Sequence, residues 1–146
     1  AKGRFRYLGV TTHNPQQYAE MQEVMRRHPL DFIQLNYSLA DRSAEKEILP
    51  LARDRGIAVL VNLPFARGSL FKAVSGLALP DWAAEIDASS WGQVFLKYVI
   101  SYPASTLPIP GTTKPHHVKD NMAASLGRLP DEGLRREIEN FVTPLL

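Results

Sequence analysis

One polar stretch contains the residue types that bind phosphate groups, and it lies where a strand is predicted to lead into a helix. The apolar run 106–109 predicts a short buried strand, and an amphipathic run at helical spacing begins at position 115. Pro115 suits the first position of that helix, because the N–H group that proline lacks would have no partner there. The polar residues between the two elements are Gly111, Thr112, Thr113, Lys114, His116 and His117.

Phosphate binding is the chemistry that this stretch favours. The free N–H groups at the start of a helix and the positive end of the helix dipole attract anions. Lys114 adds a positive charge, and the neighbouring threonines add hydroxyl groups. An ordinary polar loop between a strand and a helix remains the alternative.

Polar or glycine-containing segments also follow the three other predicted strands. These strands are expected at 5–10, 31–37 and 57–61, and the last is a continuous apolar run typical of a buried parallel strand. The carboxyl ends of parallel strands meet at one edge of a sheet, so the four segments are expected to form a single site. The first three segments are Thr11–His13, Gln34–Tyr37 and Asn62–Gly68.

The segments between the predicted strands have helical patterns. Helices are expected from Pro15 to His28, from Ser43 to Arg55, after the capping-box sequence Ser90–Gln93, from Pro115 and from about Pro130. Alternating strands and helices indicate an α/β fold with a parallel sheet and right-handed crossovers. Four such units and a C-terminal helix predict the C-terminal half of a (β/α)8 TIM barrel, as a single unit over residues 1–146.

Composition excludes several other classes. The chain of 146 residues has 17 basic and 15 acidic residues and no cysteine, which argues against nucleic-acid binding and rules out disulfides and thiolate metal sites. No metal is expected at the histidines, because adjacent histidines at a helix start point in different directions. No apolar run approaches the roughly 20 residues of a membrane span. A cytoplasmic location is expected, with a periplasmic one left open.

The four strand ends resemble, in order, those of the aldo/keto reductase family. In that family Gly-Val-Ser-Asn follows the fifth barrel strand and a glutamine opens the sixth-strand motif, similar to Gly9–Thr12 and Gln34 here. The family's last strand ends in Ile-Pro-Gly or Ile-Pro-Lys and is followed by a Glu-Asn pair, similar to Ile109–Gly111 and Asp120-Asn121. The resemblance covers essentially the whole chain.

The resemblance implies that this chain binds NADP. Thr11, Thr12 and Gln34 would hold the nicotinamide carboxamide, and Asn62 replaces an aromatic residue that often stacks on the nicotinamide ring in the family. Pro64, Phe65, Arg67 and Gly68 would form the loop around the pyrophosphate, with Arg67 supplying a cation. The residues expected at the adenosine and its 2′-phosphate are Gly111, Thr112, Thr113, Lys114, His117, Asp120 and Asn121.

The resemblance extends only to the second half of the family's barrel. The family's catalytic Asp, Tyr, Lys and His come from the first half, and no matching motif is present. No residue of this chain is therefore expected to be catalytic, and its tyrosines are interpreted as core or surface residues. The complete protein would be an NADP-dependent oxidoreductase that reduces a small aldehyde or ketone to an alcohol, with this chain supplying most of the cofactor site.

Three other functions stay open. The chain could be a nicotinamide-nucleotide-binding module without catalysis, a regulatory barrel protein, or an unrelated phosphate-binding half-barrel. In each case half a barrel leaves two open sheet edges and an uncovered inner face, on which Val59 and Val61 are expected. The chain is therefore expected to pair with the missing N-terminal half of the barrel or with a second copy.

Overall fold

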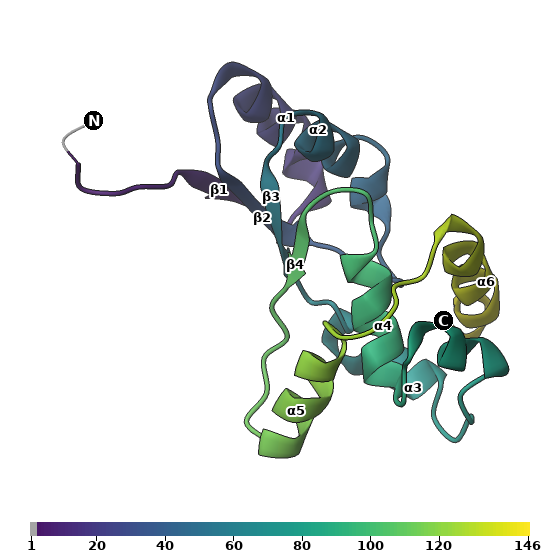
Figure 1. Cartoon of the computed structure of the whole chain (residues 1–146). Coiled ribbons are helices and arrows are strands. Elements are labelled where there is room, and N and C mark those ends of the chain that lie inside the picture. Colours follow the sequence, from purple (N-terminus) through teal and green to yellow (C-terminus); the bar gives the residue numbers. More distant parts are fainter. Residues whose placement is uncertain (1–2) are drawn as a thin grey trace.

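Four parallel strands form one sheet in the computed structural model, which describes residues 3–146. The strand order is β1-β2-β3-β4, so each strand pairs with its neighbours in sequence, as in a barrel wall. Figure 1 shows α1, α2 and α4 together on one side of this sheet. The strands are β1 Gly9–Thr11, β2 Phe32–Asn36, β3 Ala58–Asn62 and β4 Thr106–Pro108.

Helical segments follow every strand and confirm the predicted alternation. A further helix ends the chain. The α-helices are α1 Tyr18–Arg27, α2 Ile48–Asp54, α3 Ser69–Ala73, α4 Trp91–Ile100, α5 Pro115–Ala123 and α6 Glu132–Val142. Short 3-10 helices are η1 Pro15–Gln17, η2 Ser43–Glu45, η3 Ala66–Gly68, η4 Asp81–Ile86 and η5 Thr143–Leu145.

Polar side chains cap the amino ends of α4 and α6, and the cap of α4 stands where it was predicted. The Ser90 side chain accepts a hydrogen bond from the Gln93 N–H at 3.1 Å and caps α4. The Gln93 side chain accepts from the N–H of Ser89 at 2.9 Å rather than from that of Ser90, so the predicted capping box is shifted by one residue. Asp131 caps α6 by accepting from the Leu134 N–H at 2.8 Å.

Two predicted elements are shorter than expected. Pairing of the first strand begins only at Gly9, and Phe5 and Tyr7 before it are 65% and 64% exposed. The glycine permits a close approach to β2, because a Cβ atom there would lie 2.8 Å from the Phe32 carbonyl oxygen. The helix predicted from residue 43 becomes η2 followed by α2, since Pro50 lacks the N–H that a helix begun earlier would need.

The two faces of the sheet differ in burial. Val59 and Val61 are fully buried in the core with the helices, so the prediction that they lie on the inner face of the half-barrel is wrong. Side chains alternate along a strand, and the alternation places Leu60 and Asn62 on the inner face instead. Leu107, paired in register with Leu60, is 47% exposed on that same face.

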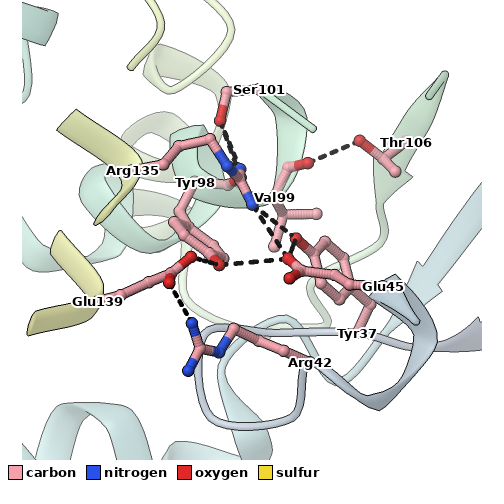
Figure 2. Close-up of polar contacts among 9 residues, drawn as sticks. All are labelled: Tyr37, Arg42, Glu45, Tyr98, Val99, Ser101, Thr106, Arg135 and Glu139. Carbon is pink, nitrogen blue, oxygen red and sulfur yellow. Dashed lines mark hydrogen bonds and ion pairs between the residues drawn. The ribbon is translucent and has the colours of Figure 1, made fainter. Parts of the chain in front are cut away.

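A polar network fastens α6 to the rest of the fold (Figure 2). The Arg135 guanidinium donates to the Tyr37 hydroxyl at 3.0 Å and to the Glu45 carboxylate at 3.1 Å. The Tyr98 hydroxyl donates to Glu139 at 2.5 Å, and Glu139 also pairs with Arg42. Burial is the main cause that raises the pKa of the Tyr37 and Tyr98 phenols far above the ordinary range. Both tyrosines are fully buried, as their interpretation as core residues requires.

Candidate functional site

A cleft of about 520 Å³ opens at the carboxyl ends of β2, β3 and β4. Its lining residues come from these three strand ends, from the segment after β1, and from the loop and short helices that follow β3. They are His13, Asn36, Asn62, Leu63, Pro64, Phe65, Arg67, Gly68, Phe71, Ile109, Pro110 and Gly111.

A second cleft of about 480 Å³ adjoins the first and extends to the amino end of α5. The two clefts share Phe65, Phe71 and Gly111 and so form one continuous trough. The second cleft is also lined by Ser90, Trp91, Gly92, Thr112, His117, Asp120 and Asn121.

Most of the predicted site residues line this trough. Asn62, Pro64, Arg67 and Gly68 line the first cleft only. Thr112, His117, Asp120 and Asn121 line the second only, and Phe65 and Gly111 line both. The trough thus brings together predicted site residues that lie up to 59 positions apart (62 to 121) in the chain.

Thr11 and Thr12 lie away from the trough and line a separate cavity of about 200 Å³ beside α1. Thr12 is buried, and its hydroxyl donates to the Gln17 side chain at 2.6 Å and accepts from the Asn14 N–H at 3.0 Å. These bonds stabilise the turn that enters η1, so the Thr12 hydroxyl already has partners within the chain.

Gln34 points to the inner face of the sheet, in register with Leu60. Its amide nitrogen donates to the Asn62 side-chain oxygen at 2.8 Å, so its partner is another side chain rather than the backbone. Asn62 forms part of the lining of the first cleft, whereas Gln34 is not among the lining residues and contacts the lining through this bond. A pair of amides joined by one bond still presents both a donor and an acceptor to a ligand.

The loop after β3 has an uncommon backbone. Leu63, Ala66 and Arg67 have φ values of 51°, 48° and 55°, and Gly68 has 89°. Left-handed conformations at three non-glycine residues are costly, by roughly 1 kcal/mol or more each, and they cluster at functional sites. The loop turns the exposed Arg67 side chain to the wall of the first cleft.

The segment before α5 is compact and exposed. Lys114 is the N-cap residue of α5, and its N–H donates to the Thr112 hydroxyl at 3.2 Å. The same hydroxyl lies 3.4 Å from His117 Nδ1. Neither Lys114 nor Thr113 lines a cleft, but both flank the amino end of α5, where the free N–H groups of that helix begin.

Nine residues that line the trough were given no ligand contact by the resemblance, although two of them, His13 and Asn36, lie in strand-end segments that were predicted to form the site. His13 and Asn36 lie at strand ends, and the Asn36 amide donates to the His13 carbonyl oxygen at 3.0 Å. The Asn36 Oδ1 atom is buried and has no hydrogen-bond partner among residues 3–146. Its position two residues after Gln34 on the same strand face was the signal that could have identified it. Phe71 packs on Phe65 with ring centroids 4.9 Å apart, and it lies in a stretch that carries no clear sequence pattern.

Other kinds of site have little support in the described part of the chain. Residues 3–146 contain no group of three or more His, Asp or Glu residues able to hold a metal ion. None of the described helices is long and apolar enough to span a membrane. No tyrosine is among the residues that line the two adjoining clefts.

Comparison with known proteins supports the resemblance seen in the sequence. The chain is 24% identical over 170 residues to "Probable aldo-keto reductase 1" of Glycine max, covering 94% of this chain and 46% of that protein. It is 28% identical over 149 residues to the NADH-specific methylglyoxal reductase of Escherichia coli, covering 85% and 45%. An aldo/keto reductase of Klebsiella pneumoniae, solved in complex with NADP and acetate, superposes with a TM-score of 0.73 at 25% identity, covering 97% and 50%.

These matches fix both the family and the extent of the similarity. The chain spans about half the length of each of these proteins. Its four parallel strands and helices match half of the barrel of the solved aldo/keto reductases. The sequence profile of the aldo/keto reductase family matches residues 1–138. The chain belongs to the aldo/keto reductase family.

Proposed function

We propose that this chain supplies most of the cofactor site of an NADP-dependent oxidoreductase that reduces aldehydes or ketones to alcohols. The observation that carries the proposal is the continuous trough along the carboxyl ends of the strands, with cationic and hydrogen-bonding groups towards both of its ends. Ligands of α/β barrels bind at this end of the strands. A trough made of two joined clefts suits a ligand made of two joined nucleotides.

The residues along the trough fit the parts of NADP. Arg67 and the left-handed loop that ends at Gly68 offer a cation and backbone N–H groups for the pyrophosphate. At the other end, Lys114, Thr113 and His117 surround the amino end of α5 and suit the 2′-phosphate. Asn121 and the aromatic rings of Phe65 and Phe71 suit a purine base in the second cleft.

Gln34 and Asn62 fit the carboxamide of the nicotinamide. Their joined amides present a donor and an acceptor, and Asn62 lines the first cleft. Thr11 and Thr12 would contribute to this contact only after a rearrangement of the turn before η1, because the Thr12 hydroxyl is bonded to Gln17. The contact from Gln34 and Asn62 therefore replaces the one expected from the threonines.

When bound, the reduced nicotinamide supplies the hydride for carbonyl reduction. The role that we assign to this chain is to bind the cofactor and fix its orientation. The buried Tyr37 and Tyr98 donate to carboxylates within the core, so neither is available to protonate a substrate. In the proposal the proton donor and its partners come from the missing N-terminal half of the barrel.

The relatives support a nicotinamide nucleotide as the cofactor class. The Klebsiella pneumoniae structure contains NADP, whereas the Escherichia coli relative is named as NADH-specific. The preference for NADP over NAD therefore rests on Lys114 and the amino end of α5 in this chain, and not on similarity to the relatives alone.

A non-catalytic nucleotide-binding or regulatory barrel protein is the second candidate. Asn62 favours it, because an amide cannot stack on the nicotinamide ring as an aromatic side chain can. The Thr12 hydroxyl is hydrogen-bonded within its own turn, which also favours weaker binding of the nicotinamide end of the cofactor.

Binding and turnover together test the proposal. Titration calorimetry with NADPH, and with 2′,5′-ADP as a probe of the adenosine end, should give binding to the chain, and Trp91 in the second cleft should report it by fluorescence. A panel of aldehydes should give only background reduction with the chain alone, and turnover once an N-terminal barrel half carrying the family's Asp, Tyr, Lys and His is added.

Other results of these experiments would favour the second candidate or reject part of the proposal. Binding without turnover by the complete barrel would favour the non-catalytic protein. Absence of binding to both nucleotides would reject the cofactor site. Robust turnover by the chain alone would reject the assignment of the proton donor to the other half.

A further inference from the structure

Both carboxylate oxygens of Asp120 on α5 accept a hydrogen bond from the start of α4. Oδ2 accepts from the Ser90 hydroxyl at 2.7 Å, and Oδ1 accepts from the Gln93 amide nitrogen at 2.7 Å. Hydrogen bonds to a carboxylate are stronger than those between neutral groups. The carboxylate also lies at the amino end of α4, where the helix dipole favours a negative charge.

The sequence of α4 is adapted to this contact. A Cβ atom at Gly92 would lie 3.0 Å from Asp120 Oδ2, so a larger residue there would require the Asp120 carboxylate to shift by a few tenths of an ångström. Ser90 serves both helices, because its oxygen accepts from the Gln93 N–H while its proton goes to Asp120. The cap of α4 and the attachment of α5 are therefore one hydrogen-bonded unit.

Little else holds α5 in position. None of its residues is fully buried, and Val118 and Met122 are 47% and 64% exposed. Beyond its carboxyl end, the buried Lys97 of α4 donates to the carbonyl oxygens of Leu126 at 2.5 Å and Arg128 at 2.9 Å. Polar contacts from the α4 region thus hold α5 at Asp120 and hold the turn that follows the helix.

We infer that Asp120 is a positioning residue that fixes the second turn of α5 against the start of α4, and that it does not itself recognise the nucleotide base. The consequence of this inference for nucleotide binding rests on the proposed function. With Asp120 engaged by Ser90 and Gln93, the neighbouring Asn121 is the side chain of this helix turn that is left to contact a base in the second cleft. Asp120 thereby determines the position of the phosphate-binding residues that precede α5 and of those that lie within it.

Base selectivity separates positioning from recognition. The probes are 2′,5′-ADP and the matching hypoxanthine nucleotide, which lacks the exocyclic amino group of adenine. Asp120→Ala should weaken binding of both by the same factor, roughly tenfold, and leave their affinity ratio unchanged. Asn121→Ala should bring that ratio towards one.

Two variants test the contact from the α4 side. Ser90→Ala should weaken both nucleotides in the same way, and its effect should not add to that of Asp120→Ala, because the two residues share one interaction. Gly92→Ala should also weaken the binding of both nucleotides, because the added Cβ atom would crowd the Asp120 carboxylate. An affinity ratio that collapses in Asp120→Ala would overturn the inference.

A readout without nucleotide keeps the inference independent of the proposed function. Asp120→Ala and Ser90→Ala should both speed amide hydrogen exchange in α5, whereas Lys114→Ala should not. Unchanged exchange in both variants would overturn the positioning role even if nucleotides bind. Faster exchange in a chain that binds neither probe would support the positioning role and reject the cofactor site.

Discussion

The guanidinium of Arg135 on α6 donates a hydrogen bond to the Tyr37 hydroxyl at the end of β2, at 3.0 Å, although 98 positions separate the two residues. The same Arg135 packs over the ring of Tyr98, with 4.0 Å between its Cζ atom and the ring centroid. Arg135 therefore joins the second strand, the α4 helix and the last α-helix. It does so on the helix-covered side of the sheet, away from the residues that line the trough.

Arg135→Met should lower the free energy of unfolding by about 3 kcal/mol, because the Glu45 carboxylate loses its paired cation and keeps the hydrogen bonds from the Tyr37 and Tyr98 hydroxyls. Arg136→Met is the matched control, since Arg136 pairs with Glu132 on the surface, where side-chain exposures are 65% and 84%. The control should cost no more than about 0.5 kcal/mol. Urea unfolding curves measure both, and equal losses would show that the Arg135 network adds no stability.

Stability should also fall at alkaline pH because of Tyr37 and Tyr98. Burial raises the pKa of both phenols in the folded state, whereas unfolded phenols ionise near pH 10. The unfolded chain then loses protons first, so the stability present below about pH 10 is lost as pH rises further, by up to about 1.4 kcal/mol per pH unit for each tyrosine.

Absorbance at about 295 nm, where tyrosinate absorbs, measures this titration. The two buried phenols should ionise only when the chain unfolds. Tyr37→Phe and Tyr98→Phe should each remove one late-titrating group. Ionisation of all tyrosines in a single step with the fold intact would contradict the prediction.

Much of the fold could be predicted from the sequence, because periodicity and helix signals act locally. The capping serine of α4, Pro115 at the start of α5 and the glycine after α2 all stand where predicted. The faces of β3 could not be predicted, since every residue of its run is apolar and the pattern carries no alternation. Only contact with the helices shows that Val59 and Val61 belong to the core.

The candidate site could be predicted in part for a similar reason. Strand ends identify which residues meet, so Asn62, Arg67 and Asn121 were predicted and do line the trough. The hydrogen-bond partners of these side chains cannot be predicted from the positions of strand ends. The bonds of Thr12 to Gln17 and of Asp120 to Ser90 depend on how a turn and two helices pack, and those bonds occupy polar groups that the sequence leaves free.

The chain should prefer NADPH to NADH because Lys114 and the amino end of α5 attract an additional phosphate. Lys114→Ala should weaken NADPH binding by about 1.5–3 kcal/mol and leave NADH binding nearly unchanged. Lys119→Ala is the matched control, an exposed lysine of the same helix beyond its first turn. Calorimetric titration of both cofactors would contradict the assignment if affinities are equal in the wild type or if both lysine variants lose the same amount.

The isolated chain should not remain a monomer, because two apolar surfaces lack cover within residues 3–146. Leu107 and Ile109 on the last strand segment are each 47% exposed, and β1 and β4 are open edges of the sheet. Met122 on α5 and Leu126 in the turn after it are 64% and 69% exposed. Burying apolar surface is worth about 25 cal/mol per Å², so covering a few hundred Å² outweighs much of the cost of association.

Light scattering at micromolar concentration should therefore report a mass above 16.3 kDa for the chain alone. Met122→Glu with Leu126→Glu should shift the distribution towards the monomer, whereas Lys119→Glu, which changes charge on the same helix without removing apolar surface, should not. Addition of an N-terminal barrel half should replace the self-associated form by a one-to-one complex, because both cover the same strand edges. A monomer that unfolds cooperatively at micromolar concentration and below would show that these surfaces need no partner.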